Sequence, residues 1–161
     1  MLGTFPHAEG RTALTDVVII GLGNSFRRDD GVGIAVSTRI AEHAVPGVRV
    51  VTGAGEPTVI VDAWKCAARA VVVDAAIGND VTPGRIRRWS AHDLEVSPTV
   101  SSHALGLAQT WALGEALDQL PAELMVFTVD AADTGHGVGL TPAVAAAVPK
   151  LVDTILVELN Y

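Results

Sequence analysis

This chain has carboxylates and an imidazole, two kinds of side chain that bind metal ions, near the ends of its predicted strands and helices. Asp29 and Asp30 come after the first strand, Asp74 ends the third, and His103 precedes a helix. In an open α/β sheet the ligand crevice lies beyond the carboxyl ends of the strands, so polar residues there carry extra weight. Their oxygen and nitrogen donors suit a borderline divalent ion such as zinc or nickel.

Each of these side chains also has a structural alternative. Asp29 or Asp30 can cap the helix that follows, because a carboxylate oxygen accepts a backbone N–H and its charge suits the helix dipole. Asp74 can serve a turn, although a carboxylate that ends an apolar strand loses solvation unless something pairs with it. His103 can be a helix-start residue with a local hydrogen bond. Sequence separation does not choose between these roles.

Two competing motifs fail on the same residues. The run 21–23, GLG, begins like a dinucleotide fingerprint, but Phe26 occupies the third glycine position and no acidic residue closes the second strand near Thr52. No G-x-S-x-G elbow is present, and the adjacent Ser102 and His103 are poorly placed to act as nucleophile and base. A nucleotide cofactor and serine hydrolysis are both disfavoured.

The elements that must position these residues alternate along the chain. Short apolar runs predict buried strands, and apolar residues at helical spacing, bounded by Pro and Gly, predict helices. The predicted strands are 17–20, 48–51, 70–73, 85–89 and 124–129, and the predicted helices are 31–44, 57–64, 103–120 and 142–159. We expect a three-layer α/β/α sandwich with a mostly parallel five-stranded sheet and 85–89 as an antiparallel edge strand.

Details of the helices and loops complete this prediction. The polar stretch 90–102 is expected to be a loop, and Leu113, Leu117 and Leu120 are expected to share one buried helix face. Pro149 should kink or split the last helix. Cys66 is expected to be a buried, inert thiol within a helix.

Bulk composition limits the function classes. The 161 residues fit one domain, 16–161, preceded by a flexible extension, 1–15, that lacks the features of a signal peptide. A net charge of −7 argues against a nucleic-acid partner, and no apolar run is long enough to span a membrane. The single cysteine excludes an intrachain disulfide, so a cytoplasmic protein is expected. We expect it to be a monomer or a weak homo-oligomer.

Four segments together carry a family resemblance. They are GLGNSFRRDDGVG at 21–33, VVVDAAIG at 71–78, SSHALGL at 101–107 and GHGVGLTPAVAAAV at 135–148. In order and spacing they resemble hydrogenase maturation endopeptidases, over nearly the whole chain from about residue 17. The resemblance implies removal of a C-terminal tail from a nickel-iron hydrogenase large-subunit precursor, with nickel, or another divalent ion in its place, supplied by the substrate.

The resemblance also implies roles for individual residues. Asp30, Asp74 and His103 would be the catalytic and metal-contacting residues. The expected substrate contacts are Gly23, Asn24, Asp29, Glu56 and Ser102. Either the ion polarises the scissile carbonyl or a carboxylate activates water, and the sequence leaves both open.

The chain departs from the family pattern at two positions. Many members carry an acidic residue where this chain has Thr52, and some carry glutamate where it has Asp30. Loss of the first carboxylate favours an alternative function, a non-catalytic chaperone that binds the nickel-loaded precursor. A small-molecule hydrolase on the same fold is a further alternative, disfavoured by the lack of a nucleophile motif.

Overall fold

A computed structural model describes residues 17–96 and 102–161, with the side chains of 17–95 and 106–161. The predicted N-terminal extension, 1–15, lies outside the described residues. No helix in the described ranges is both long enough and apolar enough to cross a membrane.

A twisted five-stranded sheet forms the middle layer, as predicted. Its strands are β1 (Val17–Leu22), β2 (Val48–Gly53), β3 (Arg69–Ala76), β4 (Ile86–Ser90) and β5 (Glu123–Asp130), in the order β2-β1-β3-β5-β4. All neighbours pair in parallel except β4, which runs antiparallel to β5 at one edge. The three central strands are buried nearly throughout, which explains their continuous apolar runs.

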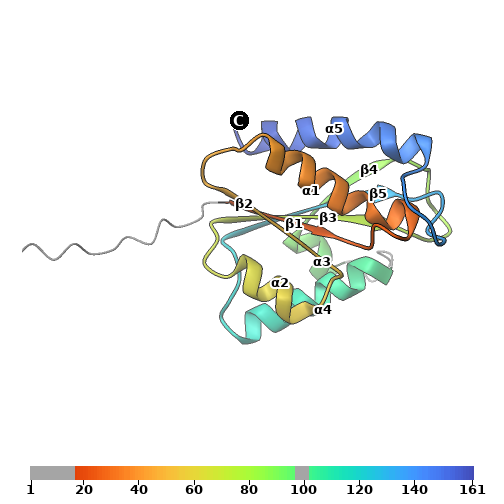
Figure 1. Cartoon of the computed structure of the whole chain (residues 1–161). Coiled ribbons are helices and arrows are strands. Elements are labelled where there is room, and N and C mark those ends of the chain that lie inside the picture. Colours follow the sequence, from red (N-terminus) through yellow and green to blue (C-terminus); the bar gives the residue numbers. More distant parts are fainter. Residues whose placement is uncertain (1–16, 97–101) are drawn as a thin grey trace, which may run out of the picture.

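Helices cover both faces of the sheet (Figure 1). They are the short 3₁₀ turn η1 (Arg28–Gly31), α1 (Val32–Glu42), α2 (Pro57–Trp64), α3 (Ala91–Val96), α4 (Ser102–Ala116) and α5 (Pro142–Glu158). α1 and α5 pack together on one face, while α2, α3 and α4 lie on the other. The predicted three-layer sandwich is confirmed.

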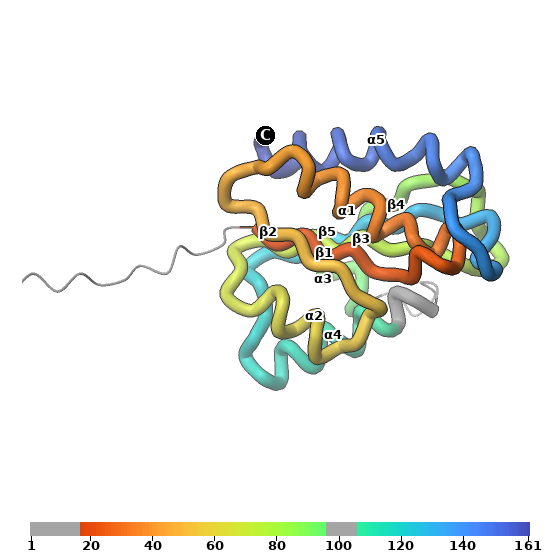
Figure 2. Tube along the Cα trace, in the orientation of Figure 1, coloured from red at the N-terminus to blue at the C-terminus, as the bar shows by residue number. Residues whose placement is uncertain are grey.

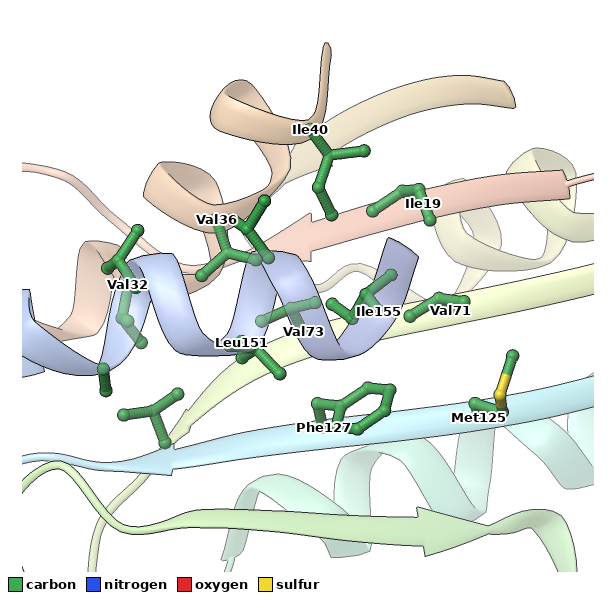
Figure 3. Close-up of a cluster of buried hydrophobic side chains, with 14 of the residues drawn as sticks. Ile19, Val32, Val36, Ile40, Val71, Val73, Met125, Phe127, Leu151 and Ile155 are labelled. Carbon is green, nitrogen blue, oxygen red and sulfur yellow. The ribbon is translucent and has the colours of Figure 1, made fainter. Parts of the chain in front are cut away.

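Successive side chains of each central strand point to opposite faces of the sheet and so pack into two separate cores. On the α1/α5 face, Ile19, Val71 and Phe127 meet helix residues such as Val36 and Leu151 (Figure 3). On the other face, a second cluster joins strand residues to α2 and α4, including the fully buried Trp64. Burying each large side chain contributes about 1.5–3 kcal/mol, so both helical layers are firmly attached.

The structure corrects one predicted strand end and one predicted loop. β3 does not end at Asp74 but continues to Ala76. The predicted loop 90–102 contains α3, which begins with a reciprocal cap: Asp93 accepts hydrogen bonds from the Ser90 backbone N–H (2.6 Å) and hydroxyl, and Ser90 Oγ accepts one from the Asp93 N–H. Residues 97–101 of that predicted loop lie outside the described residues.

Two predictions about helices are also wrong, and of the two outcomes predicted for Pro149, a kink or a split, the split is excluded. α4 ends at Ala116, so Leu117 is exposed rather than sharing the buried face of Leu113. Cys66 follows α2 in a left-handed conformation (φ 64°) and is exposed, because the helix ends two residues earlier at Trp64. Pro149 does not split α5, which runs unbroken; it lies on the exposed face, where water can solvate the freed carbonyl.

Candidate functional site

The turn after β1 is built around a close backbone contact between Gly23 and Asp30. Gly23 has φ +134°, and a Cβ added there would lie 1.8 Å from the Asp30 carbonyl oxygen. The backbone N–H of Asn24 donates to Asp30 Oδ2 at 2.9 Å, and Asn24 accepts the Arg27 N–H. Asp30, only 8% exposed, is therefore held at the rim of the turn by its backbone and its carboxylate.

Gly23→Ala is expected to displace this turn and lower the melting temperature by at least about 5 °C, since the substitution combines a clash with a strained φ. Gly53→Ala is the matched control. Gly53 accepts the Gly23 N–H, but a Cβ at Gly53 meets no atom within 4 Å. Equal melting temperatures for the two variants would contradict the close-contact account.

Asp30 does not cap α1. The N-cap position of α1 is Gly31, which has no side-chain capping bond, and the Asp30 carboxylate instead faces Asn24. The capping alternative is therefore wrong for this residue. The Asp30 carboxylate is thus fixed beside the turn after β1, which the sequence predicts to be part of the functional site.

Asp29 has a different role from its neighbour. Its carboxylate, 0% exposed, accepts hydrogen bonds from the backbone N–H groups of Ala132 (2.9 Å), Asp133 (3.0 Å) and Thr141 (2.8 Å), and from the Thr141 hydroxyl (2.8 Å). Burial by itself raises the pKa of Asp29, but the hydrogen bonds from Thr141, Asp133 and Ala132 outweigh it and hold the pKa below its ordinary value. This assigns Asp29 to tying the β5–α5 loop to η1 rather than to direct contact with a substrate.

Asp74 lies in β3 on the face of the sheet covered by α2 and α4, and it is 5% exposed. Its Oδ1 accepts the Ala75 N–H at 2.8 Å. The carboxylate opens onto a pocket of about 230 Å³. The pocket is lined by Leu22, Ala54, Gly55, Ile60, Asp74, Gly106 and Leu107. The lining combines small and aliphatic residues with exposed backbone around one carboxylate, which can hold a peptide segment and leave room for a water molecule beside the acid.

Asp30 and Asp74 belong to the same edge of the sheet. η1, which contains Asp30, packs against β3, and α1 begins close to that strand because Gly33 has no side chain: a Cβ there would lie 2.2 Å from the Val73 carbonyl oxygen. The topology thus brings the two carboxylate-bearing segments together at the carboxyl ends of β1 and β3, as predicted.

His103 is the second residue of α4, one helical turn before the pocket-lining Gly106. Its side chain, like that of Ser102, lies outside the described side chains. The described part of the chain contains no group of three or more His, Cys, Asp or Glu residues that could hold a metal ion. The metal-contacting trio, which needs His103, therefore stays a prediction.

Two residues after β2, Ala54 and Gly55, line the pocket and bring no charged side chain to it. Thr52 is exposed near the end of β2, on an edge strand, and Gly55 lines the pocket. Glu56 is exposed directly after Gly55 and precedes α2 without a side-chain capping bond. Glu56 is thus beside the pocket but is not among its lining residues.

One buried carboxylate escaped the sequence analysis. Asp130, at the end of β5, is 0% exposed and accepts hydrogen bonds from the Thr82 N–H (2.9 Å), Arg85 Nε (2.8 Å) and Arg87 Nη2 (3.2 Å). It anchors the connection between β3 and β4. The rule that selected Asp74, an acidic residue at the end of an apolar run, also applies to the sequence VFTVD and would have found it.

Comparisons with known proteins agree on one family. A family model described as hydrogenase maturation protease matches residues 34–158, from within α1 to the end of α5. The delta subunit of coenzyme F420 hydrogenase from Methanothermobacter thermautotrophicus is 23% identical over 160 residues, which cover 90% of this chain and 95% of that protein.

Solved structures share the fold. The hydrogenase maturating endopeptidase HybD from E. coli superposes with a TM-score of 0.78 at 19% identity, over 89% of this chain and 91% of that one. The [NiFe] hydrogenase maturation protease HybD from Thermococcus kodakarensis gives a TM-score of 0.68 at 26% identity, over 86% and 95% of the two chains.

Proposed function

Because the chain belongs to the hydrogenase maturation protease family, we propose that it is an endopeptidase that removes the C-terminal tail of a nickel-loaded hydrogenase large-subunit precursor in the cytoplasm. The observation that carries this proposal is the buried Asp74 carboxylate, which lines a pocket beside the segment that fixes Asp30. A carboxylate with little solvent around it, at the sheet edge where ligands bind, is suited to act on a bound peptide.

In the proposed reaction the precursor brings the nickel as part of the substrate. Asp30, Asp74 and His103 contact that ion and so place the scissile bond beside the pocket. Water adds to the carbonyl carbon, the C–N bond breaks, and the water proton passes to the leaving amine. The ion can polarise the carbonyl, or a carboxylate can take the proton from water first. In either case the nickel requirement makes metal loading a checkpoint for cleavage.

The proposal is tested by incubating the protein with the nickel-loaded precursor of its own organism and following the precursor by intact mass. Loss of the tail mass is the expected result. The second candidate function, a chaperone that binds the precursor without cutting it, is favoured by the exposed, uncharged Thr52 at the end of β2. Tight binding with an unchanged precursor mass would establish that alternative and exclude the peptidase.

Filling the pocket should block access of the tail. Gly106 lies in α4, and a Cβ added there meets no atom within 4 Å, so Gly106→Leu places its side chain in open space. We expect the KM for the precursor to rise at least about tenfold, while stability holds or improves because glycine costs a helix about 1 kcal/mol relative to alanine.

Gln109→Leu is the control for this variant, since Gln109 is exposed on α4 and does not line the pocket. It adds a leucine to the same helix and should leave the KM unchanged. Steady-state cleavage of Gly106→Leu at the wild-type KM would show that the pocket does not receive the tail.

A further inference from the structure

A second surface of this chain has the features of a docking site. Phe26 and Val138 are 72% and 77% exposed, although the protein has two well-filled cores in which most of its large apolar side chains are buried. Phe26 lies in the turn after β1, and Val138 lies in the loop between β5 and α5. The two segments lie side by side (Figure 2).

Hydrogen bonds hold the two segments in a fixed relation. The Gly137 N–H donates to the Phe26 carbonyl at 2.9 Å, and the Arg28 N–H donates to the Gly137 carbonyl at 3.0 Å. The buried Asp29 carboxylate adds its bonds to Asp133 and Thr141 on the same loop. Exposed apolar side chains on such a braced backbone lose little conformational freedom on binding, which favours a protein interface.

A pocket of about 280 Å³ adjoins this surface. Its lining includes Ile34 and Arg39 of α1, Arg28 of η1, and Val138 and Leu140 of the loop. It lies on the α1 side of the sheet, whereas the pocket at Asp74 lies on the α2/α4 side. Leu22, at the end of β1, lines the pocket at Asp74, whereas Ser25 and Gly31, which follow it in the chain, line the second pocket, so both pockets adjoin the same segment.

Charge indicates what the surface binds. Arg27, Arg28 and Arg39 lie in or beside it, against the carboxylates of Glu42 and Asp133. Only the Arg28 and Asp133 side chains pair closely among these residues, with Nε 3.4 Å from Oδ2. Asp29 and Asp30 of the same segment are buried, so among the side chains that reach solvent three arginines face two carboxylates, in a chain whose net charge is −7. An apolar side chain flanked by acidic groups complements this surface.

We propose that Phe26, Val138 and the pocket beside them form the docking surface for the folded body of the client precursor, which presents an apolar side chain next to acidic residues. This inference rests on the proposed function and adds to it a second contact, remote from the scissile bond. The surface would hold the precursor while its tail enters the pocket at Asp74.

The test compares the wild type with a Phe26→Ser/Val138→Ser double variant and with Val157→Ser. Val157 is 70% exposed on α5, away from both pockets, and serves as the matched control. With nickel-loaded precursor as substrate, the double variant should raise the KM at least about tenfold at unchanged kcat, since anchor residues carry most of an interface. Val157→Ser should behave as the wild type.

Arg39→Glu tests the charge argument. It should also raise the KM, and it should weaken the dependence of the KM on salt. An unchanged KM in the double variant would overturn the docking surface and leave the peptidase proposal standing. If the wild type binds the precursor without cutting it, the peptidase proposal fails. The docking surface is then tested by comparing the Kd of the same variants for the precursor. Loss of self-association in light scattering, with unchanged precursor binding, would assign the surface to a second copy of this chain.

Discussion

The Asp74→Asn variant is expected to fold like the wild type and to lose at least about a hundredfold in kcat/KM for the precursor. Asparagine has the same shape, and its carbonyl oxygen can still accept the Ala75 N–H that Asp74 Oδ1 accepts at 2.8 Å. It has no negative charge with which to contact a metal ion or take a proton from water. The effect should therefore fall on catalysis and not on stability.

Thermal melting and cleavage measured on the same sample separate these two effects. Asp153→Asn, on the exposed side of α5, removes one carboxylate elsewhere and should cleave as the wild type does. Loss of the folded state in Asp74→Asn would assign Asp74 to structure. Full activity would remove it from the mechanism.

The second large effect is expected at Asp29. Asp29→Ala removes the acceptor of three backbone N–H groups and one hydroxyl that the buried carboxylate now satisfies. Leaving buried donors unpaired costs about 1–3 kcal/mol each, so we expect the free energy of unfolding to fall by at least about 3 kcal/mol. Denaturant unfolding measures the change directly.

Asp133→Ala is the control, because the Asp133 side chain is half exposed in the same loop and makes only solvent-exposed contacts there, an ion pair with Arg28 worth under about 1 kcal/mol and a hydrogen bond from the Gly135 N–H. The pH dependence gives a separate check. The pKa of Asp29 is lowered in the folded state, so its contribution is complete above the unfolded value of about 4 and is lost as the pH falls through the lower folded value. Asp29→Ala should lack this acid-dependent loss; an identical acid limb in both proteins would contradict the assignment.

Much of the fold was predictable because its signals are local. The continuous apolar runs of β1, β3 and β5 require strands covered on both faces, and Pro57 and Pro142 mark the first turns of α2 and α5. The cap of α3 is equally local, because Ser90 and Asp93 have the spacing of a capping box, although the stretch was predicted to be a loop.

The distinction between Asp29 and Asp30 could not be made from the sequence. The backbone N–H groups that donate to the Asp29 carboxylate belong to Ala132, Asp133 and Thr141, which are 103 to 112 residues away along the chain. The partner of Asp30 is only six residues away, at Asn24. Two adjacent acids therefore have unlike roles that only the packing of distant loops sets.

The alternation of strands and helices predicts a parallel sheet, and the site was predicted at the carboxyl ends of its strands. That rule placed Asp74 and the Asp30 turn at one sheet edge, as the structure has them. It did not describe the pocket, because Ala54, Gly55 and Gly106 contribute space and not chemistry. Small residues of this kind have no sequence signal of their own.

The most direct test of the central claim is a comparison of one large-subunit precursor in its nickel-loaded and nickel-free forms. Each is incubated with the protein, and the precursor mass is followed with time. We predict loss of the C-terminal tail from the nickel-loaded form alone, and none with Asp74→Asn. Equal cleavage of both forms, or cleavage of neither when the loaded precursor is bound, would contradict a nickel-gated endopeptidase.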